Sequence, residues 1–172
     1  MNRIVALCFL LTSCSAFEGK QKTNVNEIIK TQEIRQLNHA EIIIAAEQYG
    51  AQTYAQIDEA YRSGQIDCAD AVAHADQTIA RLATEMEGQI VLGFEQGDFT
   101  SKQEKDLLEA YQYNQENAVQ SQPSIQMMDD KYALYTVPFA REDSVYSHCV
   151  PDTVVGMWSL VLPIKTVINH LD

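Results

Sequence analysis

The chain has 172 residues, of which 46% are hydrophobic, and its formal net charge is −12 at pH 7. This composition is sufficient for one folded domain with a single core, and it excludes a fully disordered chain. The negative charge argues against nucleic acid as a partner and against electrostatic docking on anionic lipid, because both would be repelled.

The first 14 residues predict export and lipid attachment. Arg3 makes the start positive, and the apolar run of residues 4–11 is too short for a membrane-spanning helix, which needs about 20 residues. The sequence Leu11-Thr12-Ser13-Cys14 resembles the bacterial lipobox, in which the chain is cut before a cysteine that receives the lipid. An ordinary secretory signal with an incidental cysteine is the alternative. Residues 1–13 are thus predicted to be a signal peptide, and Cys14 the lipidation site.

The mature chain is predicted to consist of a lipidated polar tether, residues 14–26, followed by one domain, residues 27–172. Loss of Arg3 with the signal peptide changes the net charge from −12 to −13. The lipid then holds the protein at a membrane of the cell envelope, on the periplasmic face or in the outer membrane. Ser15 follows the lipidated cysteine where an aspartate would retain the protein in the inner membrane, which favours the outer membrane.

Helical periodicity extends over residues 26–86. Residues 26–62 predict one long helix that ends before Gly64, and residues 66–86 predict a second helix that Gly88 stops. The stripe expected to be buried on the first helix contains Ile29, Leu37, Ala40, Ile44, Ala51, Tyr54, Ile57 and Tyr61. On the second helix the expected buried residues are Ile66, Ala69, Val72, Ala73, Ile79, Leu82 and Met86.

The remaining elements predict a sheet around a third helix. Residues 89–94 form a short apolar run, a candidate strand, and Ser101 and Glu104 match a capping box that begins a helix reaching about Asn117. Residues 124–128, 131–139 and 154–164 are rich in β-branched and aromatic side chains and predict strands, with a turn at Asp129-Asp130. We therefore expect an α+β fold in which long N-terminal helices pack on an antiparallel sheet.

The order of these segments resembles the family of exported bacterial haem domains with a PAS-like fold, often found ahead of histidine kinases. The resemblance covers residues 38–168 and rests on four stretches: residues 62–68, the helix containing Glu104, the strand of residues 132–138 that leads to Cys149, and residues 155–163. It implies a PAS-like fold with a pocket that holds the haem in that family.

The resemblance also implies that the usual haem attachment is lost. Members of the family carry a Cys-x-x-Cys-His motif, whose thiolates bond to the haem and whose histidine ligates the iron. In the corresponding window, Tyr146-Ser147-His148-Cys149-Val150, only the second cysteine is present, and a valine stands at the ligand position. Cys68 corresponds to a helix cysteine of the family, which would place Cys68 and Cys149 on the same pocket.

Cys68 and Cys149 are the two cysteines left once Cys8 is removed and Cys14 is lipidated. A disulfide is the first interpretation in an oxidising compartment, and closing a loop of about 80 residues would stabilise the fold by about 4 kcal/mol. Two free thiols are the second interpretation. The third is a metal or haem site formed by Cys68, His148 and Cys149, although adjacent strand residues point to opposite faces, which weighs against it.

Other chemistry-bearing residues have structural explanations. His39, His74 and His170 are expected to be surface or structural histidines. Asp67 and Asp70, beside Cys68 in the first turn of the second helix, are expected to favour the helix start through their charge, with an acid–base pair as the alternative. Trp158 is expected in the core, and Asp129-Asp130 lacks the further oxygen ligands of a calcium site.

Three functional hypotheses follow. The first is a non-enzymatic binding or sensing module without a cofactor, anchored by lipid, whose partners are a small-molecule ligand and an envelope protein. The second is a redox protein that holds haem or metal through non-standard cysteine and histidine ligands. The third is a structural lipoprotein of the envelope.

Overall fold

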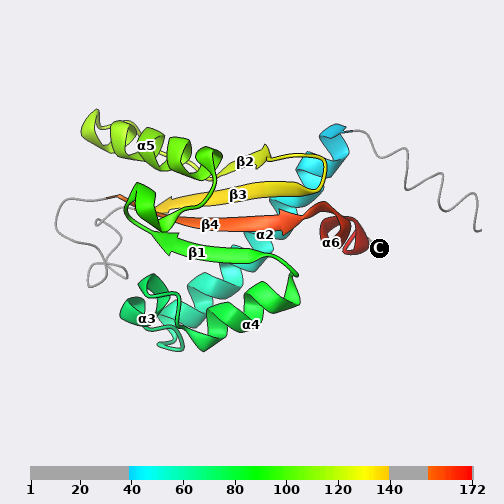
Figure 1. Cartoon of the computed structure of the whole chain (residues 1–172), viewed down its shortest axis with the longest axis horizontal. Helices are drawn as coiled ribbons and strands as arrows, with labels where there is room; N and C mark the ends of the chain where they lie inside the picture. The colour runs from blue at the N-terminus through cyan, green and yellow to red at the C-terminus, as the bar shows by residue number, and fades with distance from the viewer. Residues whose placement is uncertain (1–38, 140–154, 172) are drawn as a thin grey trace, which may run out of the picture. The chain divides into compact units, whose positions relative to one another are not determined.

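The computed structural model describes residues 39–139 and 155–171, which belong to a compact unit formed by Asn38–Asp172 (Figure 1). The elements follow in the order α2 (His39–Arg62), α3 (Cys68–Val72), α4 (Gln77–Glu85), β1 (Gln89–Gly93), the 3-10 helix η1 (Gln96–Asp98), α5 (Lys102–Glu116), β2 (Ser124–Met127), β3 (Tyr132–Phe139), β4 (Gly156–Pro163) and α6 (Ile164–Asn169). Helices combined with one antiparallel sheet confirm the predicted α+β class. The predicted signal peptide, the tether and the first part of the predicted long helix lie outside the described residues.

The sheet has four antiparallel strands in the order β1-β4-β3-β2, so the first strand of the chain pairs with the last. In this register Trp158 of β4 lies opposite Leu92 of β1 and Val137 of β3, and Ser159 lies opposite Thr136 of β3. Directly paired residues share a face of the sheet, whereas consecutive residues of a strand point to opposite faces. Trp158 and Ser159 therefore belong to different sides of β4.

Helices cover both faces of the sheet. The larger core lies between the strands and α2, α3, α4 and α6, and α2 crosses behind the strands in Figure 1. On the opposite face α5 covers a smaller apolar cluster formed by Phe99, Leu108, Tyr111, Val155 and Met157. The strand predicted at 154–164 is confirmed as β4, but its side chains are buried on both faces instead of on one. The chain turns into α6 at Ile164, an element that the sequence did not predict.

The buried side of α2 differs from the predicted stripe. Ala40, Ile44 and Ala51 are exposed, and the helix packs on the sheet through mostly small side chains. The buried residues of α2 are Ala45, Ala46, Gly50, Thr53, Ile57 and Ala60. The approach is close: an added Cβ on Gly50 would lie 2.5 Å from Cγ of Tyr135. The short distance between α2 and the sheet therefore allows mostly small side chains on the buried face of α2, and Ile44 lies on the exposed face.

The helix predicted at residues 66–86 is two helices, α3 and α4, which a break at residues 73–76 separates. Asp67 and Asp76 each cap one of them, since each side chain accepts hydrogen bonds from two backbone amides of the following turn. Ala69 and Ala73 are consequently exposed, whereas Ile66, Ile79, Leu82 and Met86 are buried as predicted.

Four helices end with the same backbone arrangement, the Schellman motif, in which a left-handed residue follows the helix. Gly64 occupies this position after α2, but His74, Glu87 and Ala118 occupy it after α3, α4 and α5, with φ values of 57°, 54° and 52°. After α5, for example, the amide of Val119 donates to the carbonyl of Asn114 at 2.8 Å. The motif satisfies carbonyls at each helix end at the cost of strain wherever a Cβ is present.

Replacing Ala118 by glycine should therefore stabilise the protein. We expect Ala118→Gly to raise the free energy of unfolding by about 0.5–1 kcal/mol, because the left-handed conformation no longer strains a Cβ. Urea denaturation measures this change. The matched control is Ala110→Gly, an exposed position inside the same helix, where the same substitution should lower the free energy of unfolding by about 1 kcal/mol. Equal effects of the two substitutions would contradict the prediction.

Candidate functional site

Cys68 is the first residue of α3, partly buried against the rest of the domain. Oδ1 of Asp67 accepts hydrogen bonds from the amides of Ala69 at 2.8 Å and Asp70 at 3.2 Å, so Asp67 is the N-cap of α3, whereas the sequence predicted only a favourable charge near the helix start. Cys68 is the one cysteine among the described residues, and it is disulfide-bonded. Its predicted partner, Cys149, lies outside the described residues, so the pairing of these two cysteines remains a prediction.

The disulfide at Cys68 weighs against this residue as a ligand of the predicted metal or haem site. A sulfur engaged in a disulfide has no thiolate to offer to an iron or zinc ion. The other members of the predicted set, His148 and Cys149, lie outside the described residues, as does the predicted lipidation site, Cys14. Within the ranges 39–139 and 155–171, no three histidine, cysteine or acidic side chains are grouped as metal ligands would be.

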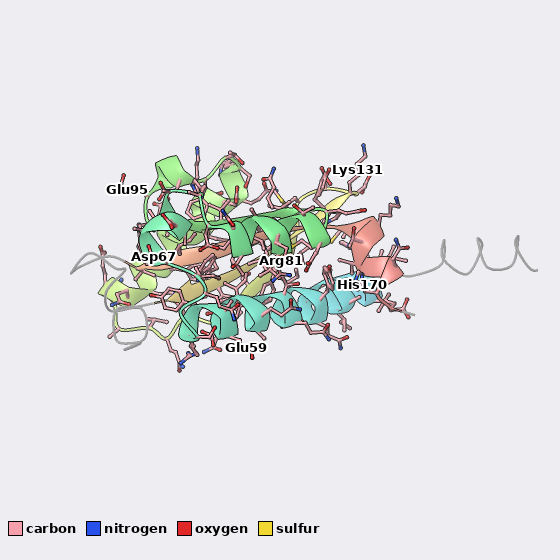
Figure 2. The ribbon with its side chains drawn as sticks, turned by 90° about the horizontal axis from the view of Figure 1, so that it is seen from below. Glu59, Asp67, Arg81, Glu95, Lys131 and His170 are labelled. Atoms are coloured by element: carbon pink, nitrogen blue, oxygen red, sulfur yellow. The ribbon has the colours of Figure 1, made fainter. Side chains whose placement is uncertain are left out.

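The histidines of the described part are exposed, as expected. The ring of His170 packs against Tyr49 with a centroid separation of 4.6 Å, and its Nδ1 lies 2.9 Å from the carbonyl oxygen of Thr166. Asp67 and His170 lie near opposite ends of α2 in Figure 2. His39 and His74 are also on the surface, and His74 takes the left-handed position after α3. These residues have structural roles and do not converge on one site.

The indole of Trp158 is the most unusual polar group of the core. The residue is completely buried, with an exposed fraction of 0%, and its Nε1 has no hydrogen-bond acceptor. No other buried side-chain nitrogen or oxygen in the described part of the chain lacks a partner. A buried donor without an acceptor costs about 1–3 kcal/mol relative to a paired one, so such groups are rare in folded proteins.

Trp158 belongs to the larger apolar cluster of the core. Leu92 and Val137, directly opposite Trp158 on the neighbouring strands, share its face of the sheet and its core cluster. Helix residues Ile57 and Ala60 from α2 and Ala71 from α3 belong to the same cluster. The indole N–H therefore lies within the layer between the sheet and α2–α4, shielded from bulk water.

The opposite face of β4 carries a buried polar network under α5. Glu104 has an exposed fraction of only 2%. Its Oε2 accepts from the amide of Ser101 at 2.9 Å and from Oγ of Ser101 at 2.7 Å, and its Oε1 accepts from Oγ of Ser159 at 2.7 Å. The predicted capping box is thus confirmed. The same carboxylate also links α5 to β4 through its hydrogen bond with Ser159.

A second polar pair follows two turns later on α5. The hydroxyl of Tyr111 and Oγ1 of Thr136 are 2.8 Å apart, and both side chains are buried. Burial raises the pKa of the Tyr111 hydroxyl above its usual value, while the hydrogen bond with Thr136 partly opposes this shift. Because Thr136 and Ser159 are opposite each other in the sheet, the two pairs hold α5 over adjacent strands.

Sequence reasoning placed Trp158 in the core and Glu104 in a capping box, but it missed the decisive property of each. The missing acceptor of the indole depends on every residue packed around it, and no local sequence signal reports this. The Glu104–Ser159 bond joins residues 55 positions apart. Alternation along β4 places the side chains of Ser159 and Trp158 on different faces of the sheet. This was the one sequence signal for a polar contact on the face that α5 covers.

Comparisons with known proteins do not add to this geometry. No protein-family model matches the chain, and neither the curated proteins nor the solved structures include a significant match. None of the helices within the described ranges has both the length and the apolar character that crossing a membrane requires.

Proposed function

We propose that this chain is a non-enzymatic binding or sensing module of the bacterial envelope, anchored by lipid at Cys14 and related to the PAS-like haem domains but without their haem. The observation that carries the binding role is the indole N–H of Trp158, buried in an apolar layer without an acceptor. A buried donor that the protein leaves unpaired calls for an explanation, and an acceptor from outside the chain is one such explanation.

Two further features support the envelope location and the haemless state. The disulfide at Cys68 is typical of an oxidising compartment, in agreement with the export signal in residues 1–13. The same disulfide removes Cys68 as a candidate ligand of iron, and Val150 stands at the family's histidine position. Helices that pack on an antiparallel sheet support the PAS-like relationship.

The binding role can be tested because Trp158 is the single tryptophan of the chain. Protein labelled with 15N, exported as a Cys14→Ser form, gives one indole N–H signal in a proton–nitrogen correlation spectrum. We expect this signal to shift upfield after unfolding in denaturant and refolding without reductant, since the bound acceptor is then lost. Native mass spectrometry of the untreated sample should show a small molecule that the refolded sample lacks.

The matched variant is Trp158→Phe, which keeps an aromatic side chain but removes the N–H donor together with the pyrrole part of the indole. This variant should fold and should lose much of the bound small molecule on purification. If the indole signal of the wild-type protein has the same position before and after refolding, and neither sample holds a small molecule, Trp158 is only a packing residue and the binding role is wrong. Recovery of a cross-linked envelope protein from that ligand-free sample would favour a structural lipoprotein.

A further inference from the structure

We infer that α5 is a detachable strap: it leaves the sheet as one unit while the strands and the helices of the opposite face stay folded. The inference goes beyond the proposed function and does not depend on a ligand at Trp158. A sensing module needs an element with two positions, because a signal acts by shifting the balance between two conformations. The way in which α5 is held on the sheet identifies it as that element.

Polar side chains of α5 connect the helix to the whole width of the sheet. They come in two neighbouring pairs about two helical turns apart, so all of them lie on the side of α5 that faces the strands. The four bonds run from Gln103 to the carbonyl of Met128 at 3.5 Å, between Glu104 and Ser159 at 2.7 Å, between Tyr111 and Thr136 at 2.8 Å, and from Gln112 to the carbonyl of Phe94 at 3.2 Å. The acceptors and donors on the sheet side thus belong to β4 and β3 and to the residues that directly follow β2 and β1.

Hydrogen bonds of this kind hold a helix in position without making its departure costly. When α5 leaves the sheet, both partners of each bond become exposed to water, which replaces the lost bond, so the net contribution of the bond is modest. Removal of Glu104 by mutation is a different case, because Ser159 and the amide of Ser101 then stay buried without their acceptor.

Apolar burial, which carries most of the stability of a fold, is unevenly divided between the two faces of the sheet. From α5, Leu108 is completely buried and Leu107 is partly buried, in the smaller apolar cluster. On the other face α2, α3, α4 and α6 enclose Trp158, Leu160 and Leu162 in the larger cluster. Since apolar stabilisation grows with the buried area, α5 is the more weakly held layer, and such layers open before the rest of a domain.

The chain on both sides of α5 allows this movement. Residues 95–97 before the helix and residues 117–120 after it are exposed, and an added Cβ on Gly97 would meet no heavy atom within 4 Å. Figure 1 shows α5 apart from the other helices. A helix of 15 residues is only marginally stable in water, so its backbone amides lose protection once it leaves the sheet. Its departure also exposes the hydroxyls of Thr136 and Ser159 on the strands beneath it.

Native-state hydrogen exchange tests this inference on the folded protein, exported as a 15N-labelled Cys14→Ser form. We expect the amides of residues 108–112 to share one free energy of opening and to exchange at least about 10-fold faster than the amides of β4, after correction for intrinsic rates. Their exchange should depend only weakly on low concentrations of urea, because little surface is exposed, whereas exchange in β4 should depend on it steeply. Opening free energies that fall gradually from the middle of α5 to its ends would indicate fraying and would overturn the inference.

Leu82→Ala, a substitution in the larger cluster, separates departure of α5 from unfolding of the whole domain. It should speed exchange in β4 by about 30-fold or more and change exchange in residues 108–112 by less than about 3-fold, because the opened state keeps the larger cluster intact. Glu104→Ala weakens the first step and should speed exchange in both regions by about 100-fold. If Leu82→Ala speeds exchange in α5 and β4 equally, or if both regions of the unsubstituted protein show the same steep urea dependence, α5 leaves only on global unfolding and the inference is wrong.

Discussion

Gly88→Ala should destabilise the fold by about 3 kcal/mol or more, because the new methyl group would overlap the carbonyl oxygen of Val161. Val161 belongs to β4, which is paired on both sides, so its backbone cannot move away without disturbing the two neighbouring strands. The added Cβ would also lie 2.8 Å from the terminal methyl of Met86, a completely packed core residue. Urea denaturation followed by the fluorescence of Trp158 measures the change in the free energy of unfolding.

Gly97→Ala is the matched control for this substitution. Gly97 lies in η1, is exposed, and an added Cβ would have no heavy atom within 4 Å. Its substitution should therefore change the free energy of unfolding by less than about 0.5 kcal/mol. Equal denaturation midpoints for the two variants would contradict the prediction. They would mean that the segment after α4 can move away from β4, so that the short distance between Gly88 and Val161 does not limit stability.

Gly88 also shows how far local sequence patterns predict this fold. A glycine after a helical pattern predicted the end of the second helix correctly, but for the wrong reason. Glu87 adopts the left-handed conformation, with φ of 54°, whereas Gly88 follows it and provides room against β4. The helix end is a local property that periodicity reveals. Which residue must lack a Cβ is decided by a strand more than 70 positions away.

The face of α2 illustrates the same limit. Periodicity predicted a helix ending before Gly64, which is confirmed, yet hydropathy selected Ile44 for the buried side, and Ile44 is 54% exposed. The predicted stripe did not include Ala46 and Gly50, which the structure buries. Their burial follows from the close packing of the helix on the sheet, a tertiary constraint that a single helix pattern does not contain.

The sequence was sufficient to single out the residues of the candidate site, but not to predict which groups their side chains contact. Strand alternation placed Trp158 inside, and the capping box identified Glu104, so both residues were singled out from sequence. The unpaired state of the indole and the bond from Glu104 to Ser159 arise only when α5 and the helices of the other face close on β4. A hydrogen bond between residues close in the chain, such as the capping box, can be predicted from the sequence. A contact between two layers of the fold cannot.

Glu104→Ala should lower the free energy of unfolding by about 3 kcal/mol, because the amide of Ser101 and the hydroxyl of Ser159 lose their common acceptor inside the protein. Glu104→Gln should have a smaller effect, since the amide oxygen can accept from one of these groups but the NH2 then faces the other. Glu109→Ala is the matched control, an exposed acidic residue of the same helix, and should change stability by less than about 0.5 kcal/mol. Chemical denaturation is again the measurement.

A double-mutant cycle with Ser159→Ala separates the bond to β4 from the capping box. If the Glu104–Ser159 hydrogen bond holds α5 on the sheet, the two single substitutions should be less than additive, with a coupling energy of about 1–2 kcal/mol. Additive effects would show that the capping box alone accounts for the contribution of Glu104. Because Ser159 neighbours Trp158 on the same strand, a coupled cycle would also mean that α5 depends on the strand that carries the proposed ligand donor.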